Sequence, residues 1–269
     1  MLTNKVLAFL KRDFAIESGY KFAFVFELFT SVFPVLSFYF IGKLVSSTNN
    51  VGLTKYGGQY FPFVIVGVAF TQYFMLALQT FAGTVRRSQW EGCLEAMLST
   101  HTQAEIIIIL SSLYSFLIKT VHVAIVFAIG GLILGVDYGN VNILSVIATL
   151  VLTVLTFSAL GIFSAAIITI LKKGDPIEWI FGSLCSLLGG ALFPITVMPN
   201  WMQKIAAFLP ITYSLDAMRL AVIKGYSIPM LWKQLLILGI MAITLLPLSV
   251  YSFSRAVDKG RHDGTLMHY

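Results

Sequence analysis

Long runs of apolar residues restrict the possible folds of this chain more than any other feature of its sequence. Several runs hold about twenty residues with few charges, the length that an α-helix needs to cross the hydrocarbon core of a bilayer. Only 11% of the 269 residues are charged, which is less than half the usual share in a soluble domain. The ~10-residue alternating segments of a transmembrane β-barrel are missing. The sequence therefore predicts an all-α integral membrane protein.

The N-terminal segment, residues 1–21, is too polar to cross a membrane. It has one apolar helical face, which predicts an amphipathic helix that lies in the membrane interface. An ordinary solvated extension is the alternative, because this apolar face is short. The residues that share the face are Val6, Leu7, Leu10 and Phe14.

We expect six spanning helices in one membrane domain, residues 22–258, followed by a cytoplasmic tail over residues 259–269. Two polar segments, residues 86–100 and 196–230, interrupt the apolar pattern, and each of them needs its own explanation. The apolar runs that predict the six spans cover residues 22–45, 60–84, 104–134, 142–171, 177–195 and 231–254.

The basic residues predict how these helices are oriented. Although the formal net charge is +6, Lys and Arg form short flanks beside the apolar runs, which is typical of membrane topology rather than of a nucleic-acid-binding face. Because the cytoplasmic side carries the excess of Lys and Arg, we expect both termini and residues 86–100 to lie in the cytoplasm. We expect the chain itself to be embedded in the inner or plasma membrane of the cell. The residues assigned to the cytoplasmic side are Lys5, Lys11, Arg12, Lys21, Arg86, Arg87, Lys172, Lys173, Arg255, Lys259 and Arg261. The smaller number assigned to the other side are Lys43, Lys55, Lys204, Arg219, Lys224 and Lys233.

The first polar segment, RRSQWEGCLEAMLST, indicates a separate helix over residues 88–100. Ser88 and Glu91 have the spacing of a capping box, which would satisfy the first amides of such a helix. The helix must end near Thr100, because Thr102 and Glu105 form a second capping box that opens the next span. The apolar face of the short helix is formed by Trp90, Leu94, Met97 and Leu98.

This short helix has two features that favour a soluble partner over the lipid surface. Glu91 and Glu95 form an acidic pair one turn apart, which suits an anionic membrane leaflet poorly. Gly92 costs roughly 1 kcal/mol inside a helix unless a partner must approach closely. The alternative is a helix that floats on the headgroups, with Trp90 as its interfacial anchor.

The second polar segment, residues 196–230, indicates two short helices outside the bilayer core. The first, NWMQKIAAFL, would end before Pro210, and the second would begin near Thr212 or Ser214 and close at Gly225. Asp216 and Arg219 lie three residues apart, so they could pair on one helical face. Such a pair would serve either a gating role or only a solvated surface.

We single out three ionisable residues within predicted spans, because such groups in a membrane are candidates for function. Glu27 belongs to the first span, and Lys119 and His122 lie one turn apart in the third. Each of them could instead reach toward the cytoplasmic edge of its span. A Glu27–Lys119 pair between helices is a further possibility. No metal site is expected, because Cys93 and Cys185 lack metal-ligand spacing.

Two separated motifs carry a resemblance to a known family. EGCLEAMLST, residues 91–100, resembles the E-G-x-L-E signature of the coupling helix in ABC-2 type permeases, the membrane subunits of a class of ABC exporters. FPITVMPNWMQKIAAFLPITYSLDAMR, residues 193–219, is similar to a second stretch of the same family, and the C-terminal GTLMHY resembles its tails. His101 and Cys93 depart from the family pattern, which commonly has proline and threonine there.

The resemblance implies a homodimer of permeases bound to two separate ATPase subunits. The coupling helix would contact the ATPase through Trp90, Leu94 and Leu98, with Glu91 and Glu95 in polar contacts beside Gly92. Because the chain contains no G-x-x-x-x-G-K-[ST], it is not expected to be an enzyme or to bind a cofactor, and ATP and Mg²⁺ would bind to the partner ATPase. A re-entrant gate between the last two spans would include Pro194, Pro199, Trp201, Pro210, Tyr213, Asp216 and Arg219.

The implied function is export of an amphipathic substrate: a lipid, a glycolipid, a lipid-linked polysaccharide or a hydrophobic drug. An ATP-independent secondary transporter or channel is the alternative, but it predicts inverted repeats or acidic clusters that the sequence does not show. A membrane-embedded enzyme would need a catalytic constellation that four scattered histidines do not supply.

Overall fold

The computed structural model describes residues 2–19, 21–45, 51–90, 104–171 and 175–262, and these residues are organised as α-helices with short 3-10 helices between them. The first half comprises α1 (Leu2–Ser18), α2 (Lys21–Val45), η1 (Val51–Tyr56), α3 (Tyr60–Trp90) and α5 (Ala104–Leu132). The second half comprises α6 (Ile143–Leu171), α7 (Pro176–Leu188), η2 (Ile195–Val197), α8 (Asn200–Ala206), α9 (Pro210–Ile223), η3 (Ile228–Leu231) and α10 (Trp232–His262).

Five helices are long and apolar enough to cross a membrane, so the chain is a multi-pass membrane protein. These spans agree with five of the six that the sequence predicts. The last helix, α10, continues to His262 and therefore includes the first residues of the predicted tail. The five spans are Val25–Leu44, Tyr60–Arg87, Ile109–Leu132, Ile143–Leu171 and Ile228–Gly260.

The predicted span over residues 177–195 is wrong in its length. Its helix, α7, has only 13 residues and is therefore about 20 Å long, shorter than the ~30 Å hydrocarbon core. It ends at Leu188 because two glycines follow, and Gly190 adopts a φ of +72° that L-residues with side chains rarely take. A sixth span exists only if α8 and α9, which are bent by 87°, are counted as one.

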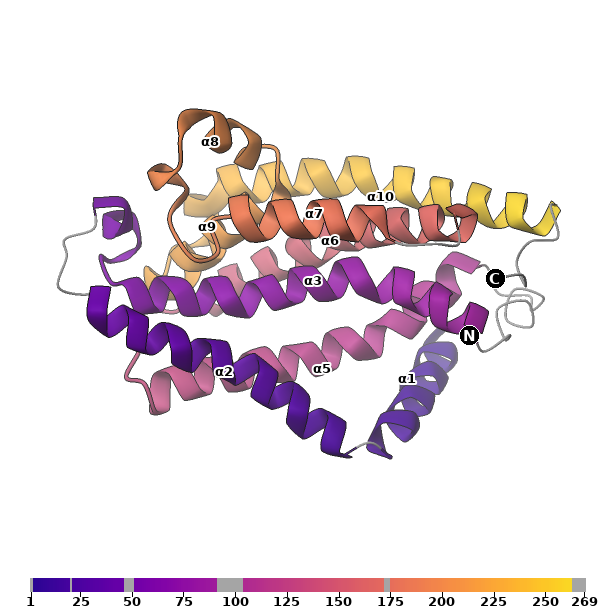
Figure 1. Cartoon of the computed structure of the whole chain (residues 1–269), viewed down its shortest axis with the longest axis horizontal. Helices are drawn as coiled ribbons and strands as arrows, with labels where there is room; N and C mark the ends of the chain where they lie inside the picture. Colours follow the sequence, from indigo (N-terminus) through magenta and orange to yellow (C-terminus); the bar gives the residue numbers. More distant parts are fainter. Residues whose placement is uncertain (1, 20, 46–50, 91–103, 172–174, 263–269) are drawn as a thin grey trace.

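The bent pair confirms the two short helices predicted between the last spans. Gly225, with a φ of +67°, follows α9 as expected. The helix α9 begins at Pro210 rather than near Thr212 or Ser214, because proline is well suited to the first helical position. Figure 1 shows α8 and α9 at the end of the bundle where η1 also lies.

The helices α3 and α6 form the centre of the bundle. Of the α3 span, 61% is buried, compared with 18% of the α2 span, which lies at the edge of the bundle. The two central helices approach closely at Gly161, where a Cβ atom would lie 2.1 Å from the carbonyl oxygen of Ala77. A cluster of buried apolar residues around Phe74 and Phe157 fills the space between them.

The N-terminal helix α1 lies at an angle to the long helices and contacts α5 (Figure 1). The Nη2 group of Arg12 donates a hydrogen bond to Ser111 Oγ over 3.4 Å, while Leu7 and Phe14 stay exposed. The predicted helix is thus confirmed, whereas its place in the membrane interface stays a prediction. At this same end of the bundle α3 ends and α5 begins, with residues 91–103 between them.

Candidate functional site

A groove of about 480 Å³ runs along the membrane-spanning part of the molecule, lined mainly by α2 and α3. Lys119 of α5, Ser186 of α7, and Ala191 and Leu192 after α7 complete its walls. Its lining mixes hydroxyl, amide and charged groups with apolar side chains, an unusual composition at the depth of a bilayer. On α2 and α3 the lining residues are Glu27, Thr30, Ser31, Pro34, Val68, Thr71, Gln72, Met75, Leu76 and Gln79.

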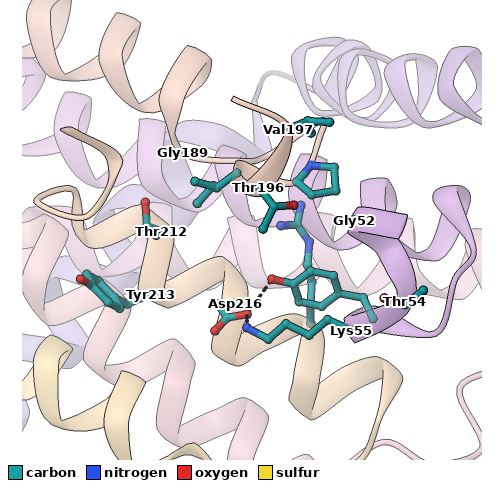
Figure 2. A pocket seen from close by; sticks show the side chains of 13 residues that line it. Gly52, Thr54, Lys55, Gly189, Thr196, Val197, Thr212, Tyr213 and Asp216 are labelled. Atoms are coloured by element: carbon teal, nitrogen blue, oxygen red, sulfur yellow. Dashed lines mark hydrogen bonds and ion pairs between the residues drawn. The ribbon is translucent and has the colours of Figure 1, made fainter. Parts of the chain in front are cut away.

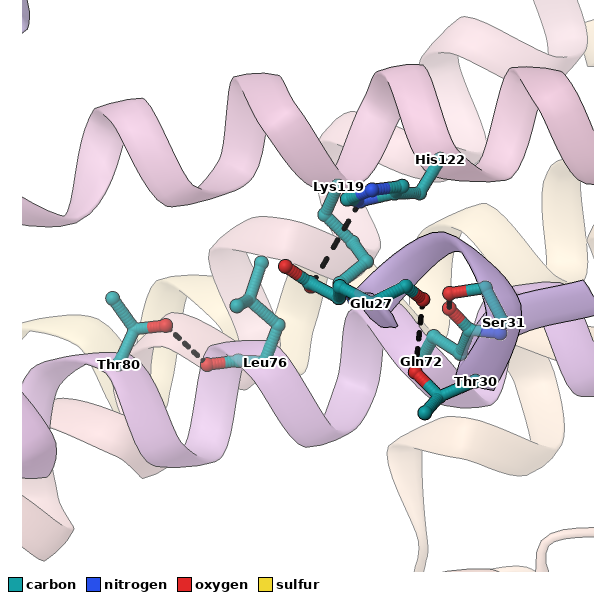
Figure 3. A network of polar contacts seen from close by, with 8 residues as sticks. All are labelled: Glu27, Thr30, Ser31, Gln72, Leu76, Thr80, Lys119 and His122. Carbon is teal, nitrogen blue, oxygen red and sulfur yellow. Dashed lines mark hydrogen bonds and ion pairs between the residues drawn. The ribbon is translucent and has the colours of Figure 1, made fainter. Parts of the chain in front are cut away.

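An ion pair between α5 and α2 lies in this groove. Lys119 Nζ is 2.8 Å from Glu27 Oε1, which confirms the pair that the sequence suggested between these residues. His122 Nδ1 lies 3.8 Å from the same carboxylate oxygen, so all three predicted intramembrane groups come together (Figure 3). The Lys119 side chain is only 12% exposed, whereas that of Glu27 is 47% exposed. The carboxylate is thus the accessible half of the pair.

Further polar contacts continue from this ion pair along α3. Ser31 Oγ donates a hydrogen bond to Gln72 Oε1 over 3.0 Å, and Gln79 Nε2 donates to Glu178 Oε1 on α7 over 2.8 Å. Gln72, Gln79 and Glu178 were not among the residues predicted from the sequence. Gln72 and Gln79 lie seven residues apart in an apolar run, which puts them on one helical face. That spacing is the signal that could have identified them.

A second cavity, of about 630 Å³, lies among η1, η2 and α9 at the end of the bundle opposite α1. We call η1, η2, α8 and α9 together the cap. Asp216 of α9 joins three elements at this cavity, since its Oδ1 accepts from Lys55 Nζ over 2.6 Å and from Tyr56 OH over 2.7 Å (Figure 2). Its Oδ2 accepts from Gln234 Nε2 of α10 over 2.8 Å. One carboxylate therefore ties η1 and α10 to α9.

The phenol of Tyr56 stays protonated in this arrangement. Burial raises the pKa of the Tyr56 phenol, and the adjacent Asp216 carboxylate raises that pKa further. A neutral phenol can donate its proton to the carboxylate, which is the bond that the structure contains.

Arg219 is the most deeply buried charge of the cap, with 3% of its surface exposed. Its Nε donates to the carbonyl oxygen of Phe63 over 3.1 Å and its Nη2 to that of Ala191 over 2.8 Å. The guanidinium carbon lies 3.4 Å from the centre of the Phe63 ring, a cation–π contact. The expected Asp216–Arg219 pair is not formed in this part of the chain, because Lys55 takes the carboxylate and main-chain carbonyls take the guanidinium.

The other predicted gate residues lie in three different environments. Pro194 and Tyr213 line the cavity, and Tyr213 OH donates to the carbonyl oxygen of Ala207 over 2.8 Å. Pro210 is the buried first residue of α9. Pro199 and Trp201 lie at the start of α8, where both are exposed, and neither lines the cavity.

The predicted coupling helix lies almost entirely outside the described residues, which include neither Glu91 and Gly92 nor Leu94, Glu95 and Leu98. The helix α3 continues through Ser88 to Trp90 without a break. Ser88 is therefore inside α3 and does not begin a new helix. Elsewhere, over the part of the chain that the structure describes, no three His, Cys, Asp or Glu residues gather as metal ligands would.

The family model described as ABC-2 type transporter matches residues 5–223, which is most of the chain and includes α2 to α9. No curated protein sequence matches the chain.

Proposed function

Because this chain belongs to the ABC-2 type transporter family, we propose that it is the permease subunit of an ATP-driven exporter. The membrane domain of this family lacks a nucleotide-binding domain, and its members typically pair with ABC ATPase subunits. ATP and Mg²⁺ would therefore bind to a separate chain. The match over residues 5–223 is the observation that carries this proposal.

The groove supports a role in moving an amphipathic substrate. Its volume of about 480 Å³ is typical of a ligand site, and it places polar groups beside apolar walls within the spans. The Glu27–Lys119 pair gives the groove charged groups without a net charge. Such a surface suits the polar head of a lipid, glycolipid, lipid-linked polysaccharide or drug while apolar parts stay against Met75 and Leu76.

Coupling to the ATPase would occur at the end of the bundle where α3 ends and α5 begins. In the proposal, residues 88–100 dock onto the ATPase with both termini on the same, cytoplasmic side. The α3 and α5 helices, which residues 91–103 join in the sequence and which both contribute residues to the groove, would follow this movement as rigid levers. A second copy of the chain would complete the exporter, and the cap would lie on the opposite face of the membrane as its gate.

Purification of the full chain from its native membranes tests the coupling. Leu94 lies on the apolar face of the predicted coupling helix, and Ser99 lies on the opposite face. We expect ATPase activity to co-purify with the wild-type chain and with Ser99→Asp, and to be lost with Leu94→Asp. The proposal is wrong if the wild-type chain brings no ATPase, or if both variants retain the activity equally.

A further inference from the structure

The cap cavity holds an excess of positive charge. Its lining contains two cations, Lys55 and Arg219, and one anion, Asp216, so the formal charge of the lining is +1. The lining of the groove, by contrast, contains Glu27 and Lys119 and is formally neutral. We propose that the cap cavity binds an anionic group, a phosphate or carboxylate, carried by a lipid headgroup or present as a free anion.

The contacts of Asp216 and Arg219 explain why this positive charge is not balanced within the cavity. Asp216 accepts three hydrogen bonds and forms its ion pair with Lys55 at 2.6 Å. Arg219 instead donates to two main-chain carbonyls and lies over the Phe63 ring, and none of these partners carries a formal charge. Asp216 lies near Arg219 on α9 but makes its ion pair with Lys55, so the Arg219 charge is the one that a bound anion would neutralise.

Donors for such an anion come from three separate elements around the cavity. Arg219 on α9 has five N–H groups, two of which the carbonyls of Phe63 and Ala191 accept. Lys55 on η1 has three, and one bond to Asp216 leaves others for a ligand. Thr196 on η2 adds a hydroxyl that lines the same cavity (Figure 2).

The space in the cavity fits this assignment. Gly52 lies beside Thr196, and a Cβ atom at position 52 would lie 3.0 Å from the Thr196 hydroxyl oxygen. The absence of a side chain therefore keeps the hydroxyl open. With about 630 Å³, the cavity accommodates a phosphate group together with part of the molecule that carries it.

A charge series tests the proposal with the purified full chain in detergent. The probes are inorganic phosphate and dihexanoyl phosphatidic acid, and titration calorimetry gives the Kd. Asp216→Asn raises the charge of the lining to +2 and should lower the Kd about fivefold or more. Lys55→Gln lowers the charge of the lining to zero and should raise the Kd by a similar factor. The double variant Lys55→Gln/Asp216→Asn restores +1 and should bind within about twofold of the wild type.

Two further variants make the result decisive. Lys204→Gln removes an exposed cation of α8 that does not line the cavity, and it should leave the Kd unchanged. Thr196→Val retains every charge and should weaken binding about threefold, which keeps the test valid if an Asp216 variant does not fold. A gain of affinity in Asp216→Asn cannot result from misfolding.

The two probes identify the source of the anion. If only phosphatidic acid binds, and its Kd changes with the charge of the lining, the cavity is assigned to a lipid headgroup. If inorganic phosphate binds and its Kd changes in the same way, the cavity is assigned to a free anion. The proposal is overturned if neither probe binds, or if the Kd values do not follow the charge of the lining. Because these measurements need neither ATP nor an ATPase, their failure would leave the permease proposal unaffected.

Discussion

The cap and the groove hold their charged groups in opposite ways. In the cap, Arg219 is 3% exposed and Asp216 is tied to three neighbouring side chains. In the groove, the Glu27 side chain is 47% exposed and belongs to α2, whose span is only 18% buried. A charge that is buried and held by several hydrogen bonds is costly to move, whereas a half-exposed pair on an edge helix can rearrange. The chain thus combines a rigid cap with a groove whose charged groups can rearrange.

Close backbone contacts reinforce the difference at the cap. At Gly67 of α3, a Cβ atom would lie 2.0 Å from the carbonyl oxygen of Ala191 and 2.7 Å from Arg219 Nη2. At Gly225, which follows α9, a Cβ atom would lie 2.1 Å from the carbonyl oxygen of Asn140. These contacts fix the cap against two other parts of the bundle, so a change in the cap should propagate as a loss of stability.

The largest effect on stability is expected from Arg219→Met. Methionine fills much of the volume but leaves the carbonyl groups of Phe63 and Ala191 without their buried donor, and the cation–π contact is lost. We expect the free energy of unfolding to fall by about 3 kcal/mol. Thermal unfolding of the purified chain in detergent measures this loss. A change below about 1 kcal/mol would show that the cap is not the rigid region described.

A second test compares two glycines of the same helix. Gly67→Ala places a methyl group against Ala191 and should destabilise the chain by about 2 kcal/mol. Gly83→Ala is the matched control, because a Cβ atom there meets nothing within 4 Å. This control should be neutral or stabilising by roughly 0.5–1 kcal/mol, since alanine favours the helix. Equal effects of the two substitutions would remove the contrast between the regions.

Glu27→Gln should have the smallest effect on stability. The amide oxygen of glutamine can still accept a hydrogen bond from Lys119, and about half of the side chain at position 27 lies outside the protein interior. We expect a loss of about 1 kcal/mol or less in the same unfolding experiment. If Glu27→Gln lowered the free energy of unfolding as much as Arg219→Met, the groove would be as rigid as the cap. It would then be unsuited to change shape during transport.

Much of this arrangement could be predicted from residues near one another in the sequence. The bent pair α8 and α9 follows from Pro210 and Gly225, which act locally on the backbone. The Glu27–Lys119 pair could be suggested because two ionisable groups within spans need partners. The length of α7 could not be predicted from hydropathy, since Gly189 and Gly190 end the helix inside an apolar run.

The cap site could not be predicted, because its partners come from distant segments. Asp216 and Lys55 are 161 residues apart, and the spacing of Asp216 and Arg219 on one helix suggested a different pair. The acceptors of Arg219 are main-chain carbonyls, which no side-chain pattern reveals. The coupling helix over residues 88–100 stays a prediction, apart from the finding that α3 extends through Trp90.

The central claim is that ATP hydrolysis by a partner chain changes the shape of the groove, while the cap keeps its internal structure and acts as one rigid unit. The test uses a Cys93→Ser background, in which the remaining cysteine, Cys185, is buried. In this background, Thr30→Cys places a thiol in the groove, and Lys204→Cys places an exposed thiol on α8. The measurement is the rate at which a maleimide labels each thiol in the ATPase-bound complex, with and without MgATP and vanadate. We predict at least a roughly fivefold change at position 30 and less than about a twofold change at position 204. An unchanged rate at position 30 would contradict the account.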